Sequence, residues 1–85
     1  MTELLYITPS AQALAPGDAL PTDPSCTQLI RVTDGIVYVR RDDDDAILFA
    51  GDSITLFAGE QRRVWNAGDE TARVVLSGTA LRLAA

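Results

Sequence analysis

The side chains of this sequence that could take part in chemistry are carboxylates, arginines, hydroxyls, two tyrosines and one cysteine. Histidine and lysine occur at none of its 85 positions. The sequence therefore excludes an imidazole general base, a Ser-His-Asp or Cys-His arrangement, a Schiff-base lysine and any imidazole ligand for a metal ion. Any chemistry must come from the groups that remain.

Four consecutive acids, Asp42 to Asp45, form the densest group of carboxylates. Hard cations such as Ca²⁺ and Mg²⁺ bind several oxygen ligands from close positions, so a metal site is one interpretation. The run lacks the alternate-position spacing and the glycine of a calcium loop, and Arg40 and Arg41 precede it. We therefore favour a solvated hairpin tip.

Cys26 and the two tyrosines are the other reactive groups. A nucleophilic cysteine needs a basic or helix-terminal setting that lowers its pKa, and neither histidine nor lysine is present to provide one. Cys26 is therefore predicted to be a small apolar filler. Tyr6 and Tyr38 are predicted to be wall residues with one polar tip rather than proton donors.

The composition is that of a globular protein, with 47% hydrophobic and 22% charged residues. We expect residues 1–85 to form a single domain. A chain of this size buries only roughly 60 to 65% of the surface of its extended form, so its core is thin. A second subunit that covers one face would add burial, and we expect a homodimer.

Twelve acidic residues against seven arginines give a net charge of −5, which disfavours nucleic acid and anionic membranes as partners. No apolar run approaches the roughly 20 residues that cross a bilayer, and no basic segment precedes an apolar one at the start. A single cysteine forms no internal disulfide, which agrees with a reducing compartment. The expected location is the cytoplasm.

Turn residues divide the sequence into short β-strands with little or no helix. Thr8-Pro9-Ser10 is expected to end the first strand, and Ser77-Gly78 to separate the last two. Turns between them, including Asp34-Gly35, are expected to form successive hairpins from residue 27 to residue 66. The expected strands are 4–7, 27–32, 36–40, 46–49, 53–57, 62–66, 71–76 and 80–83, with one more around 13–15. This spacing predicts an antiparallel sandwich or barrel.

One spaced motif makes the fold prediction specific, because Gly51, Phe57, Gly59, Arg62 and Asn66 keep every interval of the second signature of the cupins. That signature runs glycine, five residues, proline, one residue, glycine, two residues, histidine, three residues, asparagine. The segment 28–76 resembles a cupin domain. The resemblance implies an antiparallel jelly-roll barrel.

The resemblance also indicates where a metal would bind, and the residues at those places are altered. Arg62 takes the place of the histidine in the second signature, and Gln28, seven residues before Gly35, takes the place of the glutamate in the first. The remaining two histidine places fall on Thr22 and Pro24, or on Pro21 and Asp23. The retained positions Gly35, Gly51 and Gly59 are turn residues for which positive φ is favourable. We therefore expect a barrel without a metal or another cofactor, and a site built from Asp23, Cys26 and Gln28 is a less favoured hypothesis.

Strand alternation separates the residues around Arg62 into two faces. Arg62, Val64 and Asn66 share one face, which the resemblance turns toward the barrel interior. Arg63 and Trp65 share the outer face, where they are candidates for a dimer interface; terminal strands of the same chain covering Trp65 are the alternative. The candidate ligand-binding residues are Arg62, Gln28, Tyr38, Cys26 and Asn66.

Two functions remain open for Arg62 and the barrel. Arg62 either binds the carboxylate or phosphate of a small ligand, or lies near the barrel mouth and pairs with a loop aspartate or with water. We favour a metal-free module that binds a small anionic or apolar molecule or serves dimerisation and regulation. The alternative is a metal-independent isomerase, epimerase or cyclase that uses Arg62, Tyr38 and Gln28 inside the barrel.

Overall fold

Seven antiparallel β-strands make up the regular structure of residues 2–83, which are the residues described by the computed structural model. They are β1 (Thr2–Leu14), β2 (Thr27–Asp34), β3 (Val37–Arg41), β4 (Asp45–Leu48), β5 (Ser53–Leu56), β6 (Arg62–Asn66) and β7 (Ala72–Leu83). This range contains no helix, and so none that is long and apolar enough to span a membrane.

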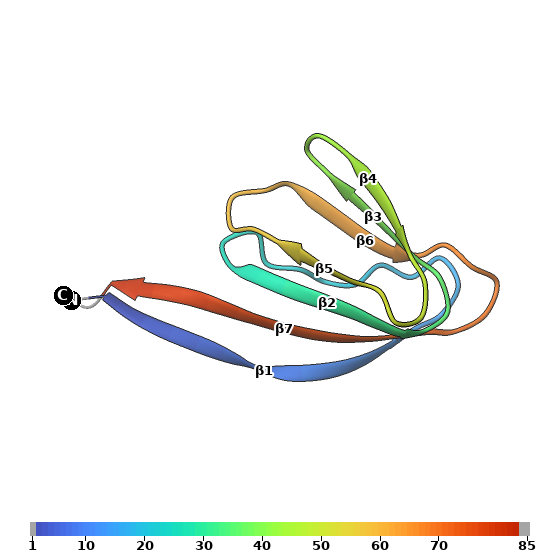
Figure 1. The fold of residues 1–85 in the computed structure, drawn as a ribbon, viewed down its shortest axis with the longest axis horizontal. Coiled ribbons are helices and arrows are strands. Elements are labelled where there is room, and N and C mark those ends of the chain that lie inside the picture. Colours follow the sequence, from blue (N-terminus) through green and yellow to red (C-terminus); the bar gives the residue numbers. More distant parts are fainter. Residues whose placement is uncertain (1, 84–85) are drawn as a thin grey trace.

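The strands form two sheets, one ordered β1-β7-β2-β5 and the other β4-β3-β6. Figure 1 shows the long β1–β7 pair on one side of the molecule and the three-stranded sheet on the other. The apolar side chains between them are buried: Leu14, Leu20, Ile30, Val32, Val37, Val39, Leu48, Leu56, Val64, Ala72 and Val74. The predicted antiparallel jelly roll is confirmed.

The connections between the sheets correct the predicted series of hairpins. Of the predicted hairpins, only that between β3 and β4 forms, because these two consecutive strands pair with each other. β2 pairs instead with β5 and β7, and β6 pairs with β3. The chain therefore crosses from one sheet to the other after β2, β4, β5 and β6. Turn residues specify only that the chain reverses, while burial of two apolar faces against each other decides which strands become neighbours.

Pro9 does not end the first strand as predicted, because β1 runs on to Leu14. The pairing of β1 with β7 shifts register between Ile7 and Ser10, which places Pro9 at an irregularity. β1 is also an edge strand, so one side of its backbone has no neighbouring strand within residues 2–83. A proline is tolerated at such a place, since no ladder hydrogen bond is lost. The short strand expected around 13–15 is the end of β1.

Gly78 does not separate two strands as predicted, because β7 is continuous. It lies between Ile7 of β1 and Gln28 of β2 in the sheet. A Cβ at this position would lie 2.9 Å from the carbonyl oxygen of Thr27. Glycine is therefore needed here for close packing of β2 on β7 and not for a turn.

The glycines predicted to form turns do so. Gly35, Gly51 and Gly59 have φ angles of 85°, 95° and 90°, which lie in the left-handed region. All three turns carry the chain between the two sheets. The Gly59 turn holds the loop that leads directly into Arg62.

Candidate functional site

β6 alternates between the barrel interior and the outer face, as its sequence predicts. Val64 and Asn66 are each only 1% exposed, whereas Arg63 is exposed. Arg62, at the start of the strand, turns its guanidinium group to the same side as Val64 and is half-buried. The expected division between an inner and an outer face is confirmed.

The guanidinium group of Arg62 donates hydrogen bonds to four oxygen atoms of its own chain. Nη1 donates to the carbonyl of Phe57 at 2.9 Å. Nη2 donates to the carbonyl of Cys26 at 2.7 Å, to Gln28 Oε1 at 2.8 Å and to the carbonyl of Asp23. These oxygens come from the loop before β2, from β2 itself and from the turn after β5. Arg62 therefore ties both sheets together at one end of the barrel.

Gln28 completes this arrangement from the buried face of β2, where it is 6% exposed. Its Oε1 atom accepts a second hydrogen bond, from the backbone N–H of Asp23 at 3.0 Å. One amide oxygen thus fixes both the Arg62 guanidinium and the loop that passes over it. A buried amide oxygen with two donors is well satisfied, which makes Gln28 a structural partner of Arg62.

The loop around Asp23 brings Cys26 to the same place. The buried Cys26 thiol lies 3.5 Å from Asp23 Oδ2, to which it donates, and 3.7 Å from Ser25 Oγ. Hydrogen bonds from the Ser25 hydroxyl and backbone N–H lower the pKa of Asp23, with smaller contributions from Cys26 and Arg62. The Asp23 carboxylate is therefore stabilised in its charged form by its own loop.

Asn66 lies at the other end of β6 from Arg62. Four strand residues span about 13 Å, so the two side chains do not share a site. Asn66 Nδ2 donates to the carbonyls of Leu14 at 2.9 Å and Glu70 at 2.6 Å, and Oδ1 accepts from the N–H of Gly68 at 2.8 Å. Its side chain joins the end of β1 to the turn before β7.

Tyr38 corrects the predicted site, because it lies on the outer face of the three-stranded sheet and not with Arg62 and Gln28. Strand alternation turns the neighbouring Val37 and Val39 inward, where both are buried. The Tyr38 hydroxyl donates to Asp45 Oδ2 at 2.6 Å. This hydrogen bond is the main cause that raises the pKa of Tyr38 and lowers that of Asp45.

Tyr38 instead forms an aromatic pair that sequence reasoning missed. It lies opposite Trp65 in the pairing of β3 with β6, and the two rings stack with centroids 4.6 Å apart and planes at 28°. The guanidinium carbon of Arg63 lies 5.0 Å from the centre of the Trp65 ring, within reach of a cation–π interaction. Trp65 is half-buried by these neighbours and by the backbone bridge to Ala19. Strand alternation in the sequence places both aromatic side chains on the outer side of their strands. That the two strands pair so that the rings stack cannot be predicted from that pattern.

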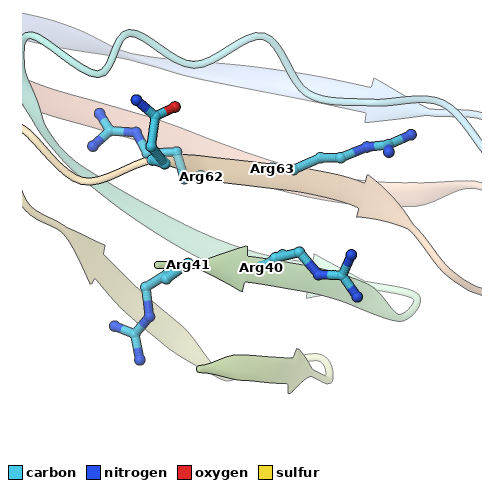
Figure 2. A pocket seen from close by; sticks show the side chains of 5 residues that line it. Arg40, Arg41, Arg62 and Arg63 are labelled. Atoms are coloured by element: carbon cyan, nitrogen blue, oxygen red, sulfur yellow. The ribbon is translucent and has the colours of Figure 1, made fainter. Parts of the chain in front are cut away.

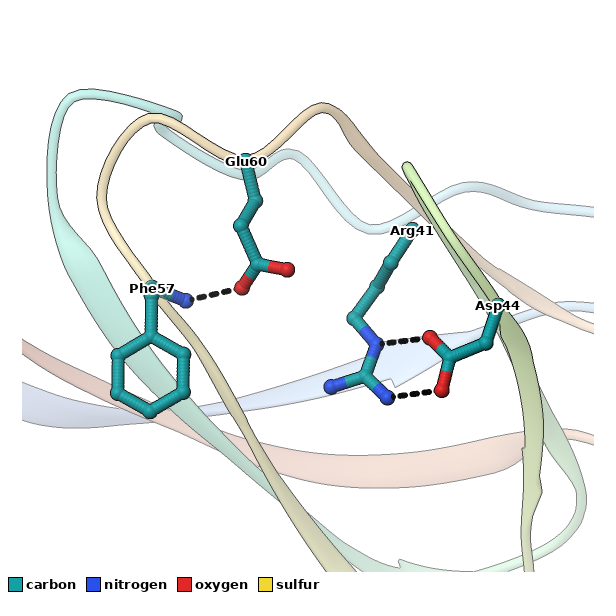
Figure 3. A network of polar contacts seen from close by, with 4 residues as sticks. All are labelled: Arg41, Asp44, Phe57 and Glu60. Carbon is teal, nitrogen blue, oxygen red and sulfur yellow. Dashed lines mark hydrogen bonds and ion pairs between the residues drawn. The ribbon is translucent and has the colours of Figure 1, made fainter.

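The acidic run is an exposed hairpin tip between β3 and β4, as predicted. Arg41 forms a bidentate ion pair with Asp44, with Nε–Oδ1 and Nη2–Oδ2 distances of 2.8 and 2.7 Å (Figure 3). The hydrogen bond to Asp44 is the main cause that raises the pKa of Arg41. Asp42 Oδ1 accepts from the backbone N–H of Gln61 at 3.2 Å and so ties the tip to the loop before β6.

A pocket of about 260 Å³ adjoins this tip. Its walls are Arg40 and Arg41 of β3 together with Gln61, Arg62 and Arg63 at the start of β6 (Figure 2). Sequence reasoning identified Arg62 and Arg63 but not their pairing with the other two arginines, which requires the register of β3 against β6.

Residues 11–78 match the protein family described as Cupin domain. The chain belongs to this family. No curated protein matches the sequence.

Solved structures share the cupin fold at low sequence identity. A cupin 2 conserved barrel domain protein from Salinispora arenicola is 21% identical, with a TM-score of 0.75 over 82% of this chain and 60% of that one. A predicted oxalate decarboxylase from Thermotoga maritima is 17% identical, with a TM-score of 0.73 over 82% and 63%. Drosophila melanogaster CENP-C, solved bound to CAL1, is 15% identical, with a TM-score of 0.73 over 82% and 63%. This cupin thus spans about 60 to 63% of the length of these three chains.

The residues of this cupin at the metal-ligand places do not fit a metal ion. One is a guanidinium cation, which already binds the oxygens of Gln28, Asp23, Cys26 and Phe57. Among the side chains that the structure describes, no three cysteine, aspartate or glutamate residues converge in a way that would hold an ion, and this includes the surroundings of Asp23 and Cys26. A second cation beside Arg62 would meet like charge. Arg62 therefore acts as a tethered cation that organises the barrel mouth.

Proposed function

We propose that this cupin is a metal-free, non-enzymatic module that functions by association, with a second copy of the chain as its partner. The observation that carries the proposal is the bonding of Arg62. The side chain at the place of the metal-binding histidine donates four hydrogen bonds to oxygens of its own chain, and its buried Nε–H has no partner among the described residues. A ligand in the barrel mouth would have to break several of these bonds at once.

The interior beneath Arg62 offers no alternative set of catalytic groups. The residues that pack below it are aliphatic, among them Ile30, Leu56 and Val64, all at most 1% exposed. Buried aliphatic side chains of this kind support a role in shape and not in chemistry. The metal-independent enzyme loses support for the same reason, since Tyr38 lies outside and Gln28 is bonded to Arg62.

The outer side of the three-stranded sheet is the surface best suited to association. We call it the aromatic face, formed by the side chains of Tyr38, Arg40, Ile47, Arg63 and Trp65. In the register of the sheet, Tyr38 lies between Ile47 on β4 and Trp65 on β6, and Ile47 is 53% exposed. Tryptophan, tyrosine and arginine are the residue types most enriched at the energetic centres of interfaces.

A second copy is the partner that fits this face. The face carries both signs, because the exposed Arg40 lies 3.4 Å from Asp45 and Arg63 makes no ion pair within the described residues. A two-fold axis can therefore set arginine of one copy against carboxylate of the other, as isologous contacts require. The thin core of an 85-residue chain adds to the benefit of covering an aromatic pair. The use of a similar fold by CENP-C in a complex with CAL1 supports a binding role.

Sedimentation equilibrium tests this proposal. We expect a mass near twice 9.1 kDa at micromolar concentration. Ile47→Asn removes an exposed apolar side chain from the centre of the aromatic face. We expect the dissociation constant of the dimer to rise about tenfold or more. Leu29→Asn is the matched control, since Leu29 is 42% exposed on the outer side of the other sheet. A monomeric mass for the wild type, or equal weakening by both variants, would contradict association through this face.

A further inference from the structure

The register of β3 against β6 places like charges opposite one another. Arg40 pairs with Arg63 and Arg41 pairs with Arg62, so four of the seven arginines lie in two adjacent cross-strand pairs. Directly opposed like charges destabilise a sheet unless counter-charges lie nearby. Four neighbouring arginines in a chain with a net charge of −5 are therefore unexpected unless they bind negative groups.

Two of the four guanidinium groups are occupied. Arg41 is bound bidentately by Asp44, and Arg62 donates to three carbonyls and the Gln28 amide. The four oxygens that accept from Arg62 are neutral, and the nearby Asp23 carboxylate offsets only part of its positive charge. This residual charge lies at the wall of the arginine-lined pocket.

The other two guanidinium groups keep free donors. The Arg40 side chain is 63% exposed, and its closest carboxylate oxygen, on Asp45, lies 3.4 Å from Nε. That carboxylate already accepts the hydroxyl of Tyr38. Arg63 is exposed, and its described interaction is with the face of Trp65. Each guanidinium carries five N–H donors, so most donors of both side chains are available.

The carboxylates around the pocket are bound to other groups and do not line it. Asp42 accepts from the N–H of Gln61, Asp44 binds Arg41, and Glu60 Oε1 accepts from the N–H of Phe57 at 2.7 Å (Figure 3). These carboxylates lower the positive electrostatic potential of the pocket. An anion would therefore bind by direct hydrogen bonds to guanidinium groups and not by long-range attraction alone. The pocket walls are formed by four arginines and Gln61, mainly by the aliphatic parts of their side chains, so a bound anion must be held by guanidinium groups at the rim.

We propose that this pocket binds a small molecule through its phosphate or carboxylate group, which the guanidinium groups of Arg40 and Arg63 hold from adjacent strands. Figure 2 shows these two side chains extending in the same direction, while Arg41 and Arg62 extend the opposite way. Guanidinium forks match the geometry of both oxyanions. A volume of about 260 Å³ exceeds that of a bare anion and leaves space for a small molecule attached to it. The site lies outside the barrel interior, on the part of the aromatic face that Arg40 and Arg63 form.

Trp65 is the only tryptophan of the chain and lies beneath Arg63, so its fluorescence is a built-in reporter of this site. The protein is titrated with inorganic phosphate, with succinate and with sodium chloride as the ionic-strength control. We expect a saturable change with phosphate or succinate at a dissociation constant on the order of 1 mM, because two exposed guanidinium groups bind weakly on their own. The arm with the tighter constant identifies the oxyanion. Absence of saturation in both arms, or the same response to chloride, would overturn the proposal.

Charge-matched variants separate a defined site from general electrostatic attraction. Calorimetric titration of Arg63→Gln and Arg40→Gln should show at least about fivefold weaker binding, and Arg63→Lys should bind more weakly than wild type because it lacks the fork. Arg31→Gln removes the same charge from an exposed position on β2 in the other sheet and should bind as wild type does. Equal weakening in Arg31→Gln would overturn the site.

Binding is tested separately from association. The proposal does not require dimerisation. Because Arg40 and Arg63 belong to the aromatic face, a dimer through that face would compete with the anion, so Ile47→Asn should bind phosphate or succinate at least as tightly as the wild type does. Loss of anion binding in that variant, with Arg40 and Arg63 intact, would also overturn the proposal. A monomeric wild type that binds the anion would leave this site standing while refuting the association proposed above.

Discussion

Arg62 and Arg63 are adjacent on β6, and their guanidinium groups have opposite surroundings. Arg62 points inward and donates to four oxygens from three separate segments. Arg63 points outward, lies over the Trp65 ring and has no ion-pair partner within the described residues. The same side chain thus holds the fold together on one face of a strand and remains available for binding on the other.

The comparison shows how the mouth of a cupin barrel is held together where an arginine stands at the place of the metal-binding histidine. A metal ion draws oxygen and nitrogen ligands together from several strands, and here a guanidinium group draws together carbonyl and amide oxygens. Arginine is suited to this because its planar fork stays charged and directs several donors at once. Arg63, on the outer face, makes no such contacts between strands.

The largest expected effect is the difference in stability between the variants Arg62→Met and Arg63→Met. Arg62→Met removes four hydrogen bonds from a charged donor, although Gln28 Oε1 and the carbonyls of Asp23 and Phe57 each keep a backbone N–H. We expect the free energy of unfolding to fall by about 2 to 4 kcal/mol. Arg63→Met removes only an exposed cation–π contact, so a loss of about 1 kcal/mol or less is expected. Urea denaturation of both variants measures the difference. Similar losses would show that the inner bonds of Arg62 do not hold the barrel mouth.

Gln28 tests whether the acceptor matters as well as the donor. Gln28→Leu removes the oxygen that binds both Arg62 Nη2 and the N–H of Asp23. We expect a loss of about 1 to 2 kcal/mol, because two donors lose a partner while an apolar side chain still fills the space. Gln61→Leu is the control on an exposed residue beside Arg62. Thermal unfolding compares the two, and a stable Gln28→Leu would assign Arg62 to its carbonyl bonds alone.

The aromatic face should give the smallest effect, which appears as a change in pH dependence. The pKa of Asp45 is lowered from 3.8, first by the Tyr38 hydroxyl. Its contribution to stability is therefore present above pH 3.8 and is lost as the pH falls through the lower folded value. The pKa of Tyr38 is raised from 10.0, so the same hydrogen bond is also lost as the pH rises above that value.

Tyr38→Phe should flatten this profile. Without the hydroxyl, the urea midpoint should fall less between pH 7 and pH 3 than it does in the wild type. Ser25→Ala serves as the comparison, because Ser25 lowers the pKa of Asp23 in the same way at the barrel mouth. If Tyr38→Phe keeps the full acid-dependent loss, the Tyr38–Asp45 hydrogen bond does not contribute to the pH dependence of folding.

Local signals predicted much of the structure. The positions of β2 to β6, the turns at Gly35, Gly51 and Gly59, the acidic hairpin tip and the two faces of β6 all follow from alternation and turn chemistry within a few residues. The errors lie where distant segments decide the outcome. Pro9 and Gly78 look like strand ends, yet β1 runs through Pro9 at a register shift on the sheet edge, and β7 runs through Gly78 between two close backbones.

The sequence by itself determined that the chain is an all-β cupin whose metal-ligand places carry no histidine, because spacing and residue type are local properties that need no contact to be read. Only the tertiary structure decided what those residues do. It brought Gln28, the loop at Asp23 and the turn at Phe57 around Arg62, and it set Tyr38 against Trp65 and Arg40 against Arg63. These contacts join residues tens of positions apart, and their register depends on how two apolar faces bury each other across the whole barrel.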